Sequence, residues 1–152
     1  MKNPRFWQVS EVQLSYHSQL QTEDYPKVTA SIDAEKLFRE NWSDDMELYE
    51  EFIVLFLNKA NQVKGLFRAS RGGSSATVVD LKIVFAAAVK AMASGIIVAH
   101  NHPSGNLAPS QADIDLTRKL RIAGEVLEMP LLDHIILAPN KGFYSFADEH
   151  MI

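Results

Sequence analysis

The chain reads Gly95-Ile96-Ile97-Val98-Ala99-His100-Asn101-His102 where a buried apolar run meets a histidine pair. The apolar run is short and rich in β-branched side chains, which predicts a buried strand that leads into His100. Side chains two positions apart on a strand point to the same side, so His100 and His102 share a face. Their Cα atoms should lie ~6.7 Å apart, at ~3.3 Å per residue. Both imidazoles can therefore bind one ion, with metal–nitrogen bonds of ~2.0–2.1 Å.

A helix start follows the histidine pair. After a loop rich in Pro and Gly, Ser110 is expected to begin a helix that runs to about Leu127. Asp113, in the first turn, can supply a third ligand. The Ser110-x-x-Asp113 spacing is also typical of a helix cap, and the two interpretations are compatible. Two histidines and one carboxylate, with a fourth position for water, are the pattern of a catalytic zinc site.

Further apolar runs on both sides of this motif predict the rest of the sheet. Phe52–Leu57 is continuous, aromatic and β-branched, which is typical of a fully buried strand. The other expected elements are an edge strand over Phe6–Tyr16, a helix from Ser31 as its cap to about Trp42, a strand over Val63–Ala69, a helix over Leu81–Met92 capped by Asp80, and strands over Leu131–Ala138 and Phe143–Phe146. This order predicts an α/β (α+β layered) fold with a mixed β-sheet flanked by helices.

Length and composition describe one globular domain. The chain has 152 residues, of which 47% are hydrophobic and 22% charged, and this suits a single core. We expect one domain over residues 1–152, with an N-terminal strand and helix extension over 1–45 and a core with the metal motif over 46–152. The longest apolar runs are far shorter than the ~20 residues of a membrane helix, and no signal-peptide pattern follows Met1. A cytoplasmic protein without membrane contact is expected.

Cysteine content and charge exclude several classes of protein. The chain has no cysteine, which excludes a disulfide framework, a thiol nucleophile, Cys-ligated zinc and a zinc nucleobase deaminase. The net charge of −4 provides no global basic footprint, so contact with nucleic acid is possible but not supported by charge. An HNH nuclease has its motif dispersed over a ββα unit, and an amidohydrolase has its His-x-His pair on the first strand of a barrel of ~250 residues. Both are excluded.

The spacing of the candidate ligands resembles a known signature. His100-x-His102, seven residues, then Ser110-x-x-Asp113 matches the JAMM (JAB/MPN) metalloprotease motif. From about Glu50 to the C-terminus the chain is similar to the RadC family. The strings that carry this second resemblance are His100-Asn101-His102-Pro103-Ser104-Gly105, Leu132-Asp133-His134-Ile135-Ile136 and Tyr144-Ser145-Phe146.

The resemblance implies a JAB/MPN (cytidine-deaminase-like) architecture and a single zinc ion (Zn2+) held by His100, His102 and Asp113. It implies that Ser110 helps to hold the oxyanion of the reaction intermediate. The function that follows is a zinc-dependent hydrolase of the JAMM type, which cleaves an amide or isopeptide bond in a protein or peptide substrate with a metal-activated water.

The family also uses a glutamate from an upstream strand as general base. In RadC-like sequences this glutamate stands two residues before the Phe that opens the apolar strand, which selects Glu50. Glu51 points to the opposite face if the strand has begun, so only one of the two can serve. We predict Glu50.

Two other functions stay open. Longer RadC proteins carry a helix–hairpin–helix region associated with DNA binding, and residues 1–45 are too short for one, which weakens the interpretation as a DNA-repair module. A non-catalytic MPN-type scaffold would lack a ligand, whereas every ligand position is filled. His134, beside Asp133 in an apolar strand, is interpreted as a structural histidine, although the resemblance places its segment near the site. Neither the substrate nor the oligomeric state has a signal in the sequence.

Overall fold

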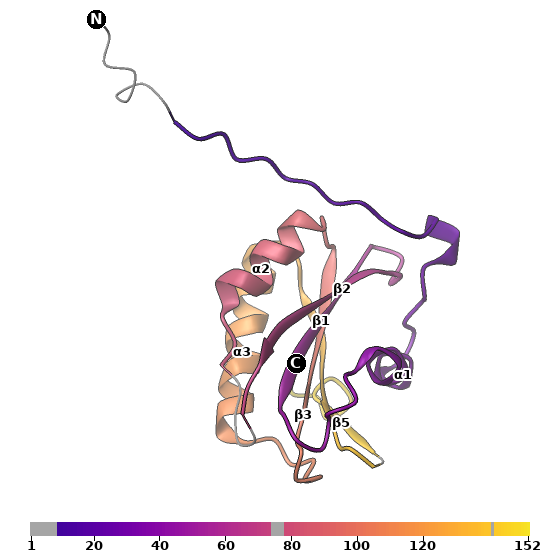
Figure 1. Ribbon diagram of the computed structural model, residues 1–152, viewed down its shortest axis with the longest axis vertical. Helices are drawn as coiled ribbons and strands as arrows, with labels where there is room; N and C mark the ends of the chain where they lie inside the picture. The colour runs from indigo at the N-terminus through magenta and orange to yellow at the C-terminus, as the bar shows by residue number, and fades with distance from the viewer. Residues whose placement is uncertain (1–8, 74–77, 141) are drawn as a thin grey trace, which may run out of the picture.

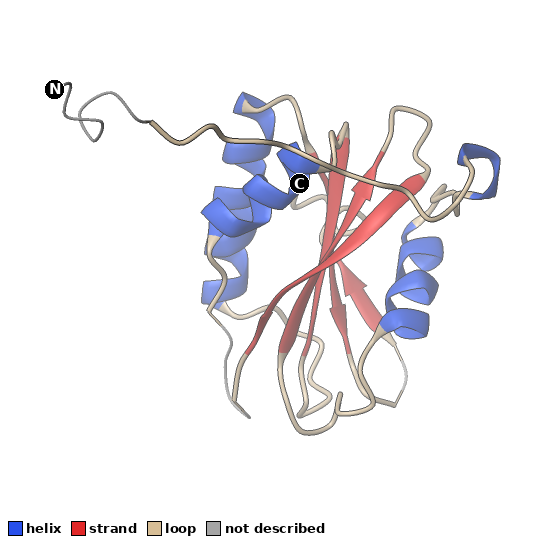
Figure 2. Cartoon of the chain, turned by 45° about the horizontal axis from the view of Figure 1, so that its top comes forward, coloured by secondary structure: helices blue, strands red, loops and turns tan. Residues whose placement is uncertain are grey.

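The computed structural model describes residues 9–73, 78–140 and 142–152. Within these ranges a central sheet has one helix on one face and two helices on the other (Figures 1 and 2). The α-helices and strands are α1 Ser31–Asn41, β1 Glu51–Leu57, β2 Val63–Arg71, α2 Leu81–Lys90, β3 Gly95–Asn101, α3 Gln111–Val126, β4 Leu131–Leu137 and β5 Phe143–Ser145, and a short 3-10 helix, Thr22–Asp24, precedes α1. The predicted α+β fold is confirmed, and it is consistent with the expected JAB/MPN architecture.

The sheet is mixed, with five strands in the order β2-β1-β3-β4-β5. β1 runs antiparallel to β2 and β3, β3 runs parallel to β4, and β4 runs antiparallel to β5. A parallel pair needs a crossover connection, and α3 supplies it between β3 and β4. The start of α3 therefore follows, after one loop, the end of β3 that carries the histidines.

Alternate side chains of the central strands pack against opposite layers. The β1 side chains that face α2 and α3 are Phe52, Val54 and Phe56, and those that face α1 are Ile53, Leu55 and Leu57. The continuous burial predicted for this strand is confirmed, because both faces of the sheet are covered. On β3, Val98 belongs to the α2/α3 side and Ala99 to the α1 side. His100 consequently lies on the α2/α3 face, and Asn101 on the α1 face.

The N-terminal segment differs from the prediction. Residues 9–16 form no strand, and the earlier positions of the strand predicted over Phe6–Tyr16 lie outside the described residues. Val9 is 93% exposed, and Tyr16 donates its hydroxyl hydrogen to the carbonyl of Lys64 at 2.5 Å. Alternation predicts which side chains share a face, but a strand also needs a neighbouring backbone to pair with. This segment has no such pairing over its described residues.

The helices were predicted closely, with one difference in capping. Asp80 caps α2 as predicted, because its side chain accepts the N–H of Lys82 at 2.9 Å. Ser31, however, is the first residue of α1 rather than its cap. The carboxylate of Asp33 accepts the N–H groups of the two residues before the helix, at 2.9 and 3.0 Å, and a charged acceptor of this kind bonds more strongly than a hydroxyl. No helix in the described ranges combines the length and apolar character that crossing a membrane requires.

Candidate metal centre

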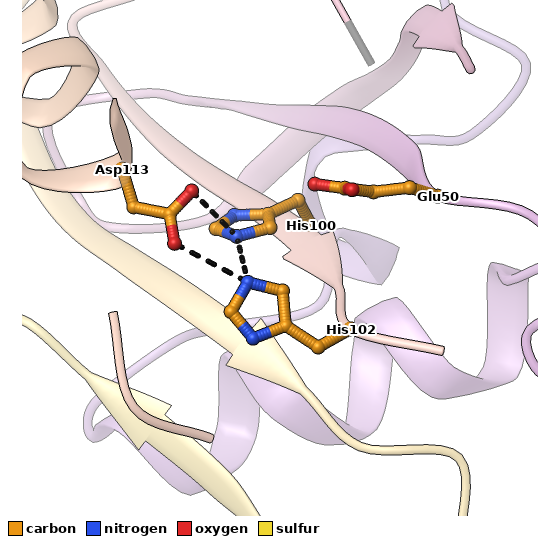
Figure 3. Close-up of side chains that lie close together, drawn as sticks. All are labelled: Glu50, His100, His102 and Asp113. Carbon is orange, nitrogen blue, oxygen red and sulfur yellow. Dashed lines mark hydrogen bonds and ion pairs between the residues drawn. The ribbon is translucent and has the colours of Figure 1, made fainter. Parts of the chain in front are cut away.

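The C-terminal end of β3 carries the two histidines. His100 is 2% exposed because its strand is covered on both faces, and His102 follows in the loop and is partly buried. Their Nε2 atoms lie 3.0 Å apart (Figure 3). At this distance both nitrogens cannot point a hydrogen at the other, so at least one presents a lone pair. The two rings converge, as the period of the strand predicts.

Asp113 reaches the histidines from the N-terminus of α3. Ser110 caps this helix, since its Oγ accepts the N–H of Asp113 at 3.1 Å while Oδ2 of Asp113 accepts the N–H of Ser110 at 2.8 Å. This capping box orients the carboxylate. Oδ1 of Asp113 lies 3.2 Å from Nε2 of His100, and Oδ2 lies 3.2 Å from Nε2 of His102. The geometry is at once that of a cap and that of a ligand group.

These three side chains fit a tetrahedral metal site. Around an ion with bonds of ~2.0–2.1 Å, tetrahedral ligand atoms lie about 3.3 Å apart, and here the facing nitrogen and oxygen atoms are separated by 3.0 to 3.2 Å. Burial alone would raise the pKa of Asp113, but the neighbouring imidazoles of His100 and His102 outweigh it and hold this pKa well below its usual range. The carboxylate is therefore ionised. Its oxygens and the imidazole nitrogens suit zinc and several other divalent ions.

Glu50 completes a group of four side chains. It precedes β1 by one residue, and its carboxylate and the ligand atoms of His100, His102 and Asp113 all lie within 4.8 Å of one another (Figure 3). Burial raises the pKa of the Glu50 carboxyl above its usual value, although the two histidines act in the opposite direction. A carboxyl group with a raised pKa is suited to proton transfer near neutral pH.

Glu51 faces the other layer of the molecule. Its buried carboxylate accepts the hydroxyl hydrogen of Ser43 and lies 3.7 Å from the guanidinium of Arg68. Adjacent side chains of a strand point to opposite faces, so the chain brings Glu50, and not Glu51, to the histidines. The role of Glu50 as general base stays a prediction.

Asn101 fixes the backbone on both sides of Glu50, and the sequence alone did not identify it. Its Oδ1 accepts the N–H of Glu51 at 2.8 Å, and its Nδ2 donates to the carbonyl of Tyr49 at 2.8 Å and to that of Met46 at 2.8 Å. Its position in the sequence could have identified it, because an asparagine inside a buried strand needs hydrogen-bond partners. Since it stands between two histidines, these partners must lie on the face of the sheet opposite the histidines.

A third histidine contacts His100 on the side away from Asp113. Nδ1 of His100 lies 2.8 Å from Nε2 of His134 in β4, and Nδ1 of His134 lies 2.7 Å from Oγ1 of Thr117 on α3. His134 is fully buried and hydrogen-bonded, as expected of a structural histidine, and it also contacts a candidate ligand. Thr117 was not identified from the sequence. Its position four residues after Asp113, on the same face of the helix, is the signal that marks it.

A small cavity opens beside the four side chains. Its volume is about 290 Å³, and the lining residues are Glu50, Phe52, Val78, Val79, His100, Ala112, Asp113 and Leu116. Ser110 is exposed and its hydroxyl oxygen is an acceptor in the cap. Its predicted action on an oxyanion stays a prediction.

Comparison with known proteins identifies the family. A family model described as the RadC-like JAB domain matches residues 28–151. A UPF0758 protein of Flavobacterium johnsoniae is 48% identical over 101 residues, which are 66% of this chain and 44% of that protein. A UPF0758 protein of Porphyromonas gingivalis is 42% identical over 103 residues, 68% of this chain and 45% of that protein. The aligned part is thus less than half the length of these curated relatives. With the match covering most of its length, the chain belongs to the RadC-like JAB domain family.

Proposed function

We propose that this chain is a zinc-dependent hydrolase of the JAMM type that cleaves an amide bond in a peptide or isopeptide linkage. The observation that carries the proposal is the convergence of two imidazole nitrogens and one carboxylate at 3.0 to 3.2 Å, with Glu50 beside them. Residues of these types at these separations fit a divalent ion, and zinc is the ion that this donor set favours in hydrolases.

Each residue has a distinct task in this proposal. His100, His102 and Asp113 hold the ion, which when bound polarises a carbonyl group and lowers the pKa of water. Glu50 takes a proton from the attacking water as the oxygen bonds to the carbonyl carbon. It then delivers that proton to the amine nitrogen as the carbon–nitrogen bond breaks. A positioned carboxylate in this role contributes ~10²–10⁴ in rate, and the place of Glu50 within 4.8 Å of the three ligand atoms supports the assignment.

Ser110 is the proposed donor to the oxyanion. Its Oγ accepts the N–H of Asp113 in the cap, an arrangement that uses a lone pair and leaves the hydroxyl hydrogen to be donated. The hydroxyl is exposed at the start of α3, next to the carboxylate that faces the histidines. One donor aimed at a developing oxyanion is worth ~2.7–4 kcal/mol.

A protein or peptide is the substrate class that we propose. The cavity beside Glu50 is walled mainly by apolar side chains, among them Phe52, Val79 and Leu116, which suits an uncharged segment of polypeptide. The net charge of −4 does not favour binding to phosphates. Neither the net charge nor the set of candidate metal ligands favours the DNA-associated or the scaffold alternative over hydrolysis.

The test is cleavage of a defined library. The purified, zinc-loaded chain is incubated with mixed peptides and with lysine-linked isopeptides, and new amino termini are detected by mass spectrometry. We expect cleavage that a chelator abolishes and added zinc restores. Absence of cleavage by chain of verified zinc content contradicts the proposal. Retardation of DNA on gels at several salt concentrations favours the DNA-associated alternative instead.

A further inference from the structure

A row of buried polar atoms leads from His100 away from the metal position. Nδ1 of His100 is 2.8 Å from Nε2 of His134, Nδ1 of His134 is 2.7 Å from Oγ1 of Thr117, and that hydroxyl is 2.7 Å from the backbone carbonyl of Asp113. The row starts on one candidate ligand and ends on the backbone of another. It connects β3, β4 and α3, three separate elements of the chain that the fold brings into contact.

The positions of the hydrogens follow from counting donors. Thr117 has one hydroxyl hydrogen, and the carbonyl of Asp113 can only accept, so the hydroxyl donates to this carbonyl. Oγ1 of Thr117 then accepts from Nδ1–H of His134. The ring of His134 is fully buried against the rings of Phe52 and Phe146, where an imidazolium charge is unfavourable, so it is neutral with a single N–H. Its Nε2 is therefore an acceptor, and the hydrogen that it receives is that on Nδ1 of His100.

The end of this row decides whether His100 can bind a metal. With its hydrogen on Nδ1, His100 presents a bare Nε2 to the carboxylate of Asp113 and to His102. In the reverse direction the row holds the same number of hydrogens, but Thr117 donates to His134, and its oxygen then faces the carbonyl oxygen of Asp113 at 2.7 Å without a hydrogen between them. His100 then carries its hydrogen on Nε2, where a metal bond must form, so this arrangement excludes the ion.

We propose that His134 and Thr117 are positioning residues that hold His100 in the tautomer with a bare Nε2, and so prepare it to bind the metal ion. The inference rests on the metal site of the proposed function, and it goes beyond it by assigning two residues that touch neither the ion nor the substrate. Ligand histidines usually donate their second ring N–H to a fixed acceptor. Here that acceptor is a neutral histidine, whose own tautomer a threonine sets.

Packing alone does not account for His134. Its ring is stacked on Phe146 with centroids 4.8 Å apart and meets Phe52 edge to face, so a phenylalanine would suit these neighbours. Burying a polar ring without hydrogen bonds is unfavourable, and both ring nitrogens of His134 are bonded. His102 is held differently, because its Nδ1 lies 2.6 Å from the carbonyl of Asn106 in an exposed loop.

The test measures zinc affinity in two pairs of variants by competition with a chromophoric chelator. His134→Phe keeps the stacked ring but removes the acceptor, and we expect zinc to bind about 10–100-fold more weakly. His134→Gln provides an amide oxygen near the position of Nε2 and should recover part of the loss. Thr117→Val, which removes the hydroxyl at constant shape, should weaken binding, and Thr117→Ser should bind as the unmodified chain does.

A spectroscopic measurement separates positioning from a general loss of structure. Nitrogen-15 shifts of imidazole rings distinguish the two tautomers, and in the zinc-loaded chain we expect the hydrogen of His100 on Nδ1. In metal-free Thr117→Val we expect a mixture of tautomers while circular dichroism is unchanged. If His134→Phe does not fold, the pair Thr117→Val and Thr117→Ser decides.

The outcomes distinguish this inference from the proposed function. Zinc binding by both His134→Phe and Thr117→Val at the affinity of the unmodified chain overturns the positioning role. If the unmodified chain binds zinc but cleaves no amide, the hydrolase proposal fails while the affinities still decide the role of His134. If the unmodified chain binds no zinc, both are overturned.

Discussion

Two aspartates of this chain are buried to a similar degree but have opposite surroundings. Asp133, 5% exposed, accepts hydrogens from the N–H of His134 at 2.7 Å, the N–H of Ala147 at 3.0 Å and the hydroxyl of Ser145 at 2.7 Å. These bonds join β4 to the C-terminal segment. Asp113, 9% exposed, has one such donor, the N–H of Ser110, and otherwise faces two imidazole nitrogens.

The comparison teaches what separates a structural carboxylate from a candidate ligand. Burial alone does not, since both side chains are buried. Asp133 is surrounded by hydrogens that the fold itself provides, and its burial raises its pKa. Asp113 faces the Nε2 atoms of two histidines at 3.2 Å, and these atoms converge with the carboxylate of Glu50. A site for a cation is recognised by that convergence.

Replacing the two aspartates should give the largest difference. Asp113→Ala removes one of the three proposed ligands, and we expect zinc content, measured by plasma mass spectrometry, to fall to background. Asp133→Asn is the matched control, because it changes a buried carboxylate that contacts the backbone of His134 but no imidazole nitrogen, and it should retain zinc. Equal zinc in Asp113→Ala and the unmodified chain would remove the proposed site.

Glu50 and Glu51 extend the comparison to adjacent residues. Glu50→Gln should keep zinc, because three ligands remain, while hydrolysis of a substrate found in the library falls by ~10²-fold or more. Glu51→Gln is the control, since its side chain lies against Ser43 and Arg68 on the other face. Zinc content and turnover are measured on the same samples. Unchanged turnover in Glu50→Gln together with an inactive Glu51→Gln would assign the general base to Glu51.

Each of the two aspartates contacts a serine, and the two serines differ in how their hydroxyl groups are used. Ser145 donates its hydroxyl hydrogen to Asp133 and accepts the N–H of Asp148, whereas the hydroxyl oxygen of Ser110 is an acceptor in its cap. Ser110→Ala should lower turnover by about 10²-fold through loss of the oxyanion donor, and lower the unfolding free energy by ~1 kcal/mol through loss of the cap. Turnover and chemical unfolding measure the two effects. Loss of stability with full turnover would leave Ser110 as a cap only.

The sequence predicted what short-range patterns encode. The strand over Phe52–Leu57 follows from a continuous apolar run, and the approach of His100 to His102 follows from the period of a strand. Contacts that depend on register between distant strands were not predicted. His134 meets His100 because β4 pairs with β3 so that Val98 lies opposite His134, and no local pattern encodes that alignment.

The same limit explains the main error in the fold. The segment predicted as a strand over Phe6–Tyr16 has loose alternation, yet its described residues pair with no other strand. A strand forms only where a second backbone segment lies beside it to share hydrogen bonds, and the sequence of a single segment contains no information on where that second segment lies. For Asn101, likewise, the sequence indicated a buried amide but not that its partners are backbone groups on both sides of Glu50.

Stability should respond to Asp133 in a way that depends on which atoms are removed. Asp133→Ala leaves the buried N–H of His134, the partly buried N–H of Ala147 and one hydroxyl without their acceptor, and we expect a loss of ~1–3 kcal/mol in the free energy of unfolding. Asp133→Asn keeps one oxygen for the N–H groups and should lose less. Urea unfolding followed by circular dichroism measures both. Equal losses in the two variants would show that the charge, and not the acceptor oxygen, determines the stability.

The pH dependence of that stability should have the sign of a raised pKa. Because burial raises the pKa of Asp133, the folded chain binds this proton more tightly than the unfolded chain does. The contribution of Asp133 to stability is therefore fully present below the unfolded pKa of about 3.9 and is lost as pH rises through the folded value. The asparagine in Asp133→Asn does not titrate. As the pH is lowered from neutrality, the unfolding free energy of the unmodified chain should therefore rise relative to that of Asp133→Asn. Unfolding is measured with a chelator present, which excludes a contribution from proton-linked metal binding. If the unfolding free energy of the unmodified chain instead falls relative to that of Asp133→Asn, the three hydrogen bonds to the carboxylate outweigh the effect of its burial on the pKa.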